Sequence, residues 1–171
     1  RSGELLALTL DDVSFEAKTI SITKSYARLG SKDIISPPKT PKSRRVITVP
    51  DFLLDVLQDY AGRLYDYDPS ERLFAYTKSY LQSEMVRGCK KSGVKKIRVH
   101  DLRHSHASLL IELGFSPLLI SERLGHENVE TTLGTYAHLY PNKHGEVSNK
   151  LNILYAPENG LKSNEKPENF E

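Results

Sequence analysis

Residues 99–140 read VHDLRHSHASLLIELGFSPLLISERLGHENVETTLGTYAHLY, a stretch that combines helical apolar spacing with two arginines and five histidines. On a helix, positions i, i+3 and i+4 share one face, so we expect His100, Arg103 and His104 to lie together. Fixed positive charge beside a titratable imidazole suits the handling of phosphate groups. His126 follows in a Leu-Gly-His turn, and Tyr136 comes ten residues later.

Apolar residues in this stretch predict which faces of its helices are buried. A stripe of leucines should anchor the first helix in a core, formed by Leu102, Leu109 and Leu113. The segment after Ser116 should add its own apolar residues to the core, namely Leu118, Leu119, Ile120 and Leu124. A short helix is expected over residues 131–136.

Upstream of this stretch the pattern changes from helical to alternating. β-Branched residues predict strands over 15–23, 33–38 and 45–50. The last two are joined by the basic loop PPKTPKSRR, which its prolines stiffen. The first residues should be buried through their leucines, Leu5, Leu6, Leu8 and Leu10. These features predict a small three-stranded antiparallel sheet with cationic loops.

Helical periodicity returns after residue 50 and recurs over 79–92 and 146–155. The first of these helices should present an apolar face made of Phe52, Leu53, Val56, Leu57 and Tyr60. The predicted fold class is therefore α+β and mainly helical, with one domain over residues 1–155. Residues 156–171 are polar, which predicts a disordered tail. Because Arg1 opens the sequence without Met and within an expected helix, we expect a fragment of a longer protein.

Composition is that of a globular protein, with 38% hydrophobic and 27% charged residues and no apolar run of membrane-spanning length. The single cysteine, Cys89, suits a reducing cytoplasm. The net charge is only +2, but residues 18–49 hold eight Lys or Arg against one acid, and residues 87–104 hold seven against one. Two such blocks indicate a surface that faces a polyanion, although solvated faces without a partner are the alternative. The candidate DNA contacts are Lys42, Arg44, Arg45, Lys95, Lys96, Arg98 and His104.

Several side chains together suit phosphoryl transfer without a metal: Arg1, Lys39 or Lys42, His100, Arg103, His126 and Tyr136. Two guanidiniums can neutralise the non-bridging oxygens of a phosphate in the transition state. A lysine can protonate a leaving oxygen, histidines can move protons, and a tyrosine can attack phosphorus. Taken singly, each residue has an ordinary structural explanation. Arg1, for example, can simply pair with Glu4 at i, i+3.

As an ordered set, these motifs resemble the tyrosine recombinase family, with the nearest likeness to integrases of phages and conjugative transposons. The set consists of R-S-G-E at 1–4, the basic hairpin PKT…RRVITVP, H-D-L-R-H at 100–104, L-G-H at 124–126 and T-Y-A-H at 135–138. The resemblance covers residues 1–140 and implies a metal-independent and cofactor-free enzyme. It also implies that helical core-binding and arm-binding domains precede this one in the whole protein.

The resemblance implies a role for each matched residue. Arg1 and Arg103 would clamp the scissile phosphate, and His126 would donate a hydrogen bond to it. His100 would shuttle protons, and Tyr136 would form a 3′-phosphotyrosyl bond with the DNA. Lys39, which lies in the family's Lys-Thr pair, would be the catalytic lysine, with Lys42 as the alternative. The implied partner is double-stranded DNA in the bacterial cytoplasm, bound by a tetramer, with the isolated fragment a monomer and no membrane involved.

Four alternatives stay open. His100 and His104 could ligate zinc at i, i+4, although H-E-x-x-H and a cysteine cluster are missing. The chain could relax DNA as a type IB topoisomerase does, or it could be a catalytically inert DNA-binding module. Tyr140 is the alternative nucleophile, but its position before Pro141 favours a packing role.

Overall fold

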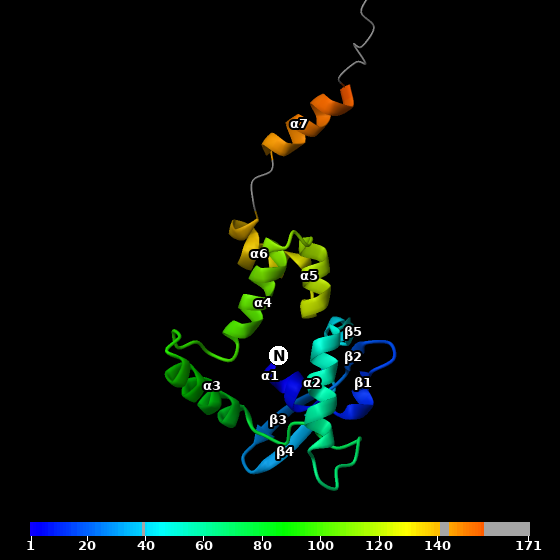
Figure 1. Ribbon diagram of the computed structural model, residues 1–171, viewed down its shortest axis with the longest axis vertical. Coiled ribbons are helices and arrows are strands. Elements are labelled where there is room, and N and C mark those ends of the chain that lie inside the picture. The colour runs from blue at the N-terminus through cyan, green and yellow to red at the C-terminus, as the bar shows by residue number, and fades with distance from the viewer. Residues whose placement is uncertain (39, 141–143, 156–171) are drawn as a thin grey trace, which may run out of the picture. The chain divides into compact units, whose positions relative to one another are not determined.

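The computed structural model describes residues 1–38, 40–140 and 144–155 (Figure 1). Residues Arg1–Leu139 form one compact unit, and a second begins at Tyr140. The described helix of the second unit, α7 (His144–Tyr155), confirms the helix predicted over 146–155. The tail predicted for 156–171 lies outside the described residues. In the part of the chain that the structure describes, no helix is long and apolar enough to cross a membrane.

The first unit opens with the short helix α1 (Ser2–Leu6) and the 3-10 turn η1 (Leu10–Asp12). A three-stranded antiparallel sheet follows, in the order β1 (Val13–Ser14), β2 (Thr19–Ile22) and β5 (Arg45–Thr48). Its central strand pairs Ile20 with Val13 on one side and with Ile47 on the other. A three-stranded antiparallel sheet is thus confirmed, but its members differ from the predicted ones.

The predicted strand over 33–38 belongs to a separate hairpin. There, β4 (Lys32–Ser36) pairs with β3 (Ser25–Leu29), a strand that the sequence pattern missed. Tyr26 is the one fully buried residue of β3, and all of β4 is exposed. With only one fully buried residue, β3 shows little of the alternation by which strands are recognised, whereas the β-branched residues of β4 do predict a strand. The basic loop after this hairpin contains the 3-10 turn η2 (Pro41–Ser43).

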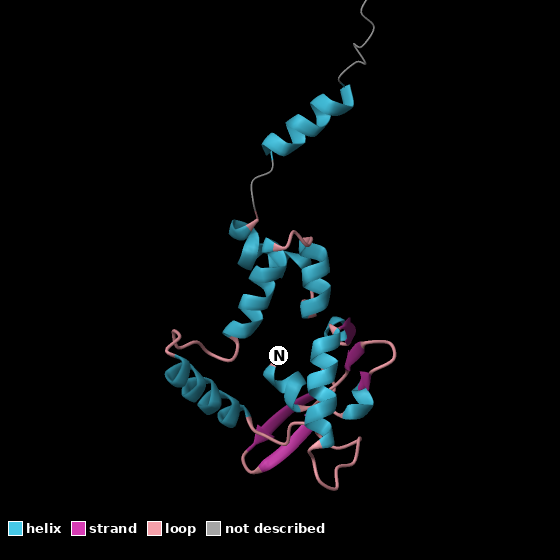
Figure 2. Ribbon diagram, in the orientation of Figure 1, coloured by secondary structure: helices cyan, strands magenta, loops and turns pink. Residues whose placement is uncertain are grey.

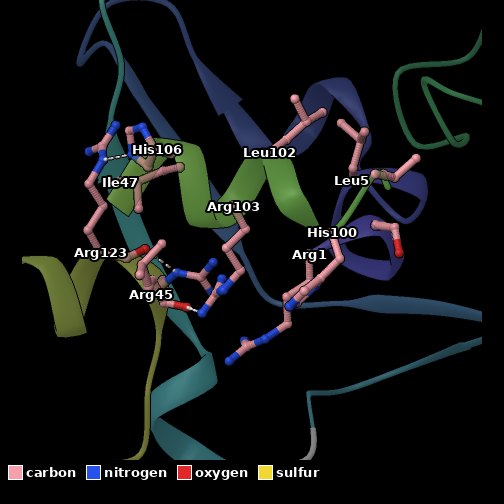
Figure 3. A pocket seen from close by; sticks show the side chains of 12 residues that line it. Arg1, Leu5, Arg45, Ile47, His100, Leu102, Arg103, His106 and Arg123 are labelled. Carbon is pink, nitrogen blue, oxygen red and sulfur yellow. Dashed lines mark hydrogen bonds between the residues drawn. The ribbon is translucent and has the colours of Figure 1, made fainter. Parts of the chain in front are cut away.

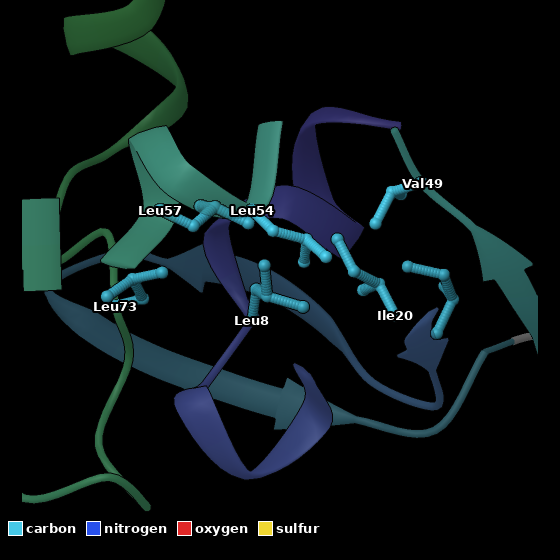
Figure 4. Close-up of a cluster of buried hydrophobic side chains, with 7 residues drawn as sticks. Leu8, Ile20, Val49, Leu54, Leu57 and Leu73 are labelled. Atoms are coloured by element: carbon cyan, nitrogen blue, oxygen red, sulfur yellow. The ribbon is translucent and has the colours of Figure 1, made fainter. Parts of the chain in front are cut away.

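Helix α2 (Asp51–Gly62) closes one face of the three-stranded sheet (Figures 1 and 4). The buried cluster between them consists of Leu8, Ile20, Ile22, Val49, Leu54, Leu57 and Leu73. The predicted apolar face of α2 is partly wrong, because Phe52 and Val56 are exposed and Leu54 points inward instead. Leu73 joins the cluster while its backbone N–H donates to the carbonyl of Leu8 at 2.8 Å.

The rest of the unit is helical (Figure 2): α3 (Lys78–Ser92), α4 (Asp101–Glu112), α5 (Pro117–Leu124), α6 (Val129–Tyr136) and the 3-10 turn η3 (Ala137–Leu139). Residues that end or begin helices set several of these helix boundaries. Gly93 ends α3 in the left-handed conformation, and Pro117 begins α5 behind the Ser116 cap. These helices confirm the mainly helical α+β class.

The predicted core stripe of α4 is wrong. Leu102, Leu109 and Leu113 are 48%, 51% and 63% exposed, whereas Ala107 and Ile111 form the buried face. In α5, Ile120 and Leu124 are buried as expected, but Leu118 and Leu119 are exposed. Leu5 of α1 is likewise exposed. Each helix in this small bundle is covered on one narrow side, and the apolar period alone does not identify that side.

Candidate functional site

Arg1 and Arg103 converge on one turn, although they are far apart in the sequence. Arg1 Nη2 donates to the carbonyl oxygen of Gly125 at 2.7 Å. Arg103 Nη2 donates to the preceding carbonyl, that of Leu124, at 2.6 Å. Two guanidiniums are therefore fixed side by side at the Leu-Gly-His turn, immediately before His126. Figure 3 shows both side chains reaching the same space from α1 and α4.

The turn depends on glycine. Gly125 ends α5 with φ +64°, a left-handed conformation that side chains with a Cβ adopt at a cost. A Cβ at this position would also lie 2.8 Å from Arg45 Nη1. Both the close approach of Arg45 and the left-handed backbone conformation therefore require glycine at position 125.

Glu4, whose spacing from Arg1 predicts only a helix ion pair, is a central residue of the site. Its side chain is 5% exposed and binds two arginines, Arg1 Nη1 at 2.6 Å and Arg45 Nη2 at 2.8 Å. Burial alone would raise the pKa of Glu4, but hydrogen bonds from Arg45 and Arg1 outweigh it and hold the pKa at about 2. An ionised carboxylate thus joins α1 to β5. The i, i+3 spacing in R-S-G-E indicated the Arg1 contact, and nothing in the sequence indicated the Arg45 contact.

Arg45, predicted to contact DNA, is turned into the site, with a side chain only 12% exposed. Besides Glu4, its guanidinium donates to the carbonyls of Ser43 and Arg123 at 2.9 Å each. Arg123 in turn donates to Thr48 O at 3.0 Å and to His106 Nε2 at 3.2 Å. These contacts hold the end of α5 against the sheet, so they position the Leu-Gly-His turn.

The cations gathered at this site repel one another. Burial, followed by the charges of Arg103, Arg1 and Arg45, lowers the pKa of His126 to about 4. Burial and the charge of Arg1 lower the pKa of Arg103 to about 10, although Glu4 acts in the opposite direction. His126 Nδ1 is held 2.8 Å from Thr132 Oγ1. An anion in this space would relieve the repulsion, so the arrangement suits a phosphate.

Tyr136 lies at the end of α6 and is only 5% exposed. Its hydroxyl is 2.6 Å from His104 Nδ1, and the His104 ring makes an edge contact with His100, with ring centroids 5.0 Å apart. Burial raises the pKa of Tyr136, and the charge of Arg103 offsets part of this effect. His100 and His104 thus lie on one face of α4 as predicted. No group of three or more metal-ligating side chains occurs among the described residues.

Two cavities flank Arg1. One, of about 310 Å³, is lined by Arg45, His100 and Arg103 among others (Figure 3). The other, of about 520 Å³, is lined by Pro38, Thr40, Ser43 and Glu127. Lys39 lies outside the described residues, but its two neighbours in the chain line this second cavity together with Arg1.

The remaining basic candidates lie on the surface. Lys42 and Arg44 are exposed in and beside η2, and Lys95, Lys96 and Arg98 are exposed between α3 and α4. Arg98 also pairs with Asp101 at 2.8 Å, which fixes the start of α4. Tyr140 follows η3 and begins the second unit.

The fold is that of tyrosine recombinase catalytic domains. The structure of the Tn1549 transposon integrase in complex with circular intermediate DNA superposes with a TM-score of 0.75 at 22% identity, over 90% of this chain and 55% of that one. The catalytic domain of bacteriophage HP1 integrase gives a TM-score of 0.53 at 25% identity, over 93% and 76% of the two chains. The structure of XerH recombinase bound to its difH substrate superposes with a TM-score of 0.61 at 24% identity. The match covers 90% of this chain and 43% of that one.

The chain belongs to the phage integrase family, whose model matches residues 1–143. The ICEBs1 integrase of Bacillus subtilis is 35% identical over 169 residues, which cover 90% of this chain and 45% of that protein. The integrase of Staphylococcus phage L54a is 32% identical, and the match covers 90% of this chain and 48% of that protein. The chain therefore spans about half the length of these relatives.

Proposed function

We propose that the chain carries the catalytic site of a site-specific DNA recombinase that integrates or excises a phage or mobile element. The observation that carries this proposal is the attachment of Arg1 and Arg103 to successive carbonyls of the turn before His126. Guanidiniums held in this way present their remaining N–H groups to one phosphate, and no rearrangement is needed when negative charge develops.

In the proposed reaction, Tyr136 Oη attacks the scissile phosphorus and gives up its proton to the histidine pair at the start of α4, His100 and His104. A bond forms between Oη and phosphorus, and the bond between phosphorus and the 5′-oxygen breaks. The leaving 5′-oxygen takes a proton from Lys39, whose chain neighbours line a cavity with Arg1. Arg1 and Arg103 neutralise the non-bridging oxygens, and His126 donates a hydrogen bond to one of them. The 3′-phosphotyrosyl bond preserves the phosphodiester energy, so a free 5′-hydroxyl can reverse the step or join a new strand.

The proposed substrate is double-stranded DNA. The exposed cations Lys42, Arg44, Lys95, Lys96 and Arg98 suit contacts to the phosphate backbone. The Tn1549 integrase and XerH structures are complexes with DNA, which supports the same partner here. By the family resemblance we also propose a tetramer on paired sites, a monomer for the isolated chain, and action in the cytoplasm, where the DNA is.

Covalent trapping tests this proposal. A nicked half-site loses its 5′-hydroxyl fragment after cleavage, so the covalent complex should accumulate with the wild-type chain and with Tyr140→Phe, but not with Tyr136→Phe. Retardation of DNA without any covalent complex would indicate an inert DNA-binding module. Relaxation of supercoiled DNA that lacks a recombination site would indicate topoisomerase-like activity instead.

A further inference from the structure

The hydroxyl of Tyr136 has one polar contact of hydrogen-bond length among the described residues, and that contact is His104 rather than His100. Tyr136 Oη and His104 Nδ1 are 2.6 Å apart, with ring centroids at 5.8 Å and planes inclined by 55°. His100 touches the ring of His104 edge-on, at a centroid distance of 5.0 Å. His100 therefore reaches the nucleophile only through His104.

We propose that His104 is the catalytic base that takes the proton of Tyr136, and that His100 is a positioning residue that orients the His104 ring. This inference rests on the proposed recombinase function and deepens it. As Oη bonds to phosphorus, its proton moves to His104 Nδ1. When the phosphotyrosyl bond is broken in rejoining, Oη leaves and takes the proton back from the same nitrogen.

The placement follows from two helices. His104 lies one turn into α4, four residues after His100 and next to Arg103, so the base and the phosphate clamp have adjacent positions on one helix. Tyr136 is the last residue of α6, which brings its ring to α4. A nitrogen within hydrogen-bond reach of the proton to be removed is the first requirement of a general base.

Hydrogen bonding and charge suit the same role. If Nδ1 accepts the tyrosine proton, the neutral imidazole must carry its hydrogen on Nε2. The charged or titratable groups that interact with His104 are His100, Asp101 and His126, in addition to Tyr136. The nearby charge of Arg103 favours the tyrosinate over the neutral phenol. The charge of Arg103 thus offsets part of the burial that disfavours the anionic oxygen of Tyr136.

The test replaces His104 by Asn, whose amide reaches the position of Nδ1 and keeps a hydrogen bond but cannot accept a proton near pH 7. Single-turnover formation of the phosphotyrosyl complex is measured on a nicked half-site. We expect a loss of about 10²–10⁴-fold in His104→Asn, the usual contribution of a general base. The rate of the variant should then rise with pH, because the tyrosine must ionise without help. Glu112→Gln, an exposed change at the end of the same helix, is the matched control.

A substrate with sulfur at the 5′-bridging position separates the two proton transfers, since the sulfur leaves as a thiolate without a proton. The defect of Lys39→Ala should disappear on this substrate, and that of His104→Asn should persist. Rescue of His104→Asn by sulfur, or wild-type rates in that variant on ordinary DNA, would overturn the proposal for His104. Absence of covalent complex with the wild-type chain on either substrate would instead overturn the proposed function.

Discussion

Replacement of Glu4 by Gln removes one negative charge from between two arginines and changes little in shape. Glu4 is almost fully buried and binds Arg1 and Arg45 at 2.6 and 2.8 Å. Its pKa is lowered from the ordinary 4.5 to about 2. Because each pKa unit corresponds to about 1.36 kcal/mol, the ionised carboxylate contributes about 3 kcal/mol to stability at pH 7. Removal of one partner from a buried ion pair has a similar cost, about 3–5 kcal/mol.

Urea unfolding of the wild type and Glu4→Gln at several pH values measures this contribution. Since the folded pKa is below the unfolded one, the stabilisation is fully present above pH 4.5 and is lost as the pH falls toward 2. The variant should therefore be about 3 kcal/mol less stable at pH 7 and should approach the wild type near pH 2. Asp59→Asn, which removes the exposed Asp59–Arg63 pair, should leave the unfolding midpoint unchanged. A Glu4→Gln difference that is negligible at pH 7, or that does not vary with pH, would refute the reasoning.

Three further predictions concern the same site and the surface around it. Gly125→Ala should lower the free energy of unfolding by about 1–3 kcal/mol, because φ is +64° and the new Cβ would meet Arg45. A Cβ at Gly134 would meet nothing within 4 Å, so the control Gly134→Ala should not destabilise the fold. Equal effects of the two substitutions would contradict this prediction. The lowered pKa of His126 means that the unfolded chain binds the proton more readily between pH 6.5 and about 4, so stability should fall on acidification through this window, by about 1–2 kcal/mol after allowance for partial exposure. His126→Gln should remove that part of the slope in pH-dependent unfolding, and an unchanged slope would show that His126 titrates normally. Lys96→Ala should weaken DNA binding and reduce the slope of log K against log salt by about 0.9 in a fluorescence titration, and an unchanged slope would exclude a phosphate contact by this exposed lysine.

Some of the fold could be predicted because local chemistry determines it. Gly93 in the left-handed conformation ends α3, and Ser116 with Pro117 begins α5. Such signals act within one turn of helix, so they can be read directly from the sequence. The shared face of His100, Arg103 and His104 has the same origin, since only helical spacing is required.

Other features depend on contacts that no local pattern specifies. The pairs Glu4–Arg45 and Arg1–Gly125 join residues 41 and 124 positions apart. The basic loop therefore predicts a surface position for Arg45, whereas its side chain is largely buried and forms an ion pair with Glu4. The exposed stripe of α4 was misassigned for a related reason, because spacing gives the apolar period but not which side a neighbouring helix covers. Strand β3 has no clear sequence signal because it buries only Tyr26 fully.

Identification of the residue joined to DNA tests the central claim most directly. After trapping on a nicked half-site, the covalent complex is digested with protease and nuclease, and the modified peptide is sequenced by mass spectrometry. The recombinase proposal predicts a nucleotide attached through its 3′-phosphate to the hydroxyl of Tyr136, the residue held 2.6 Å from His104. Attachment at Tyr140 or another residue, linkage through a 5′-phosphate, or undiminished trapping by Tyr136→Phe would contradict it.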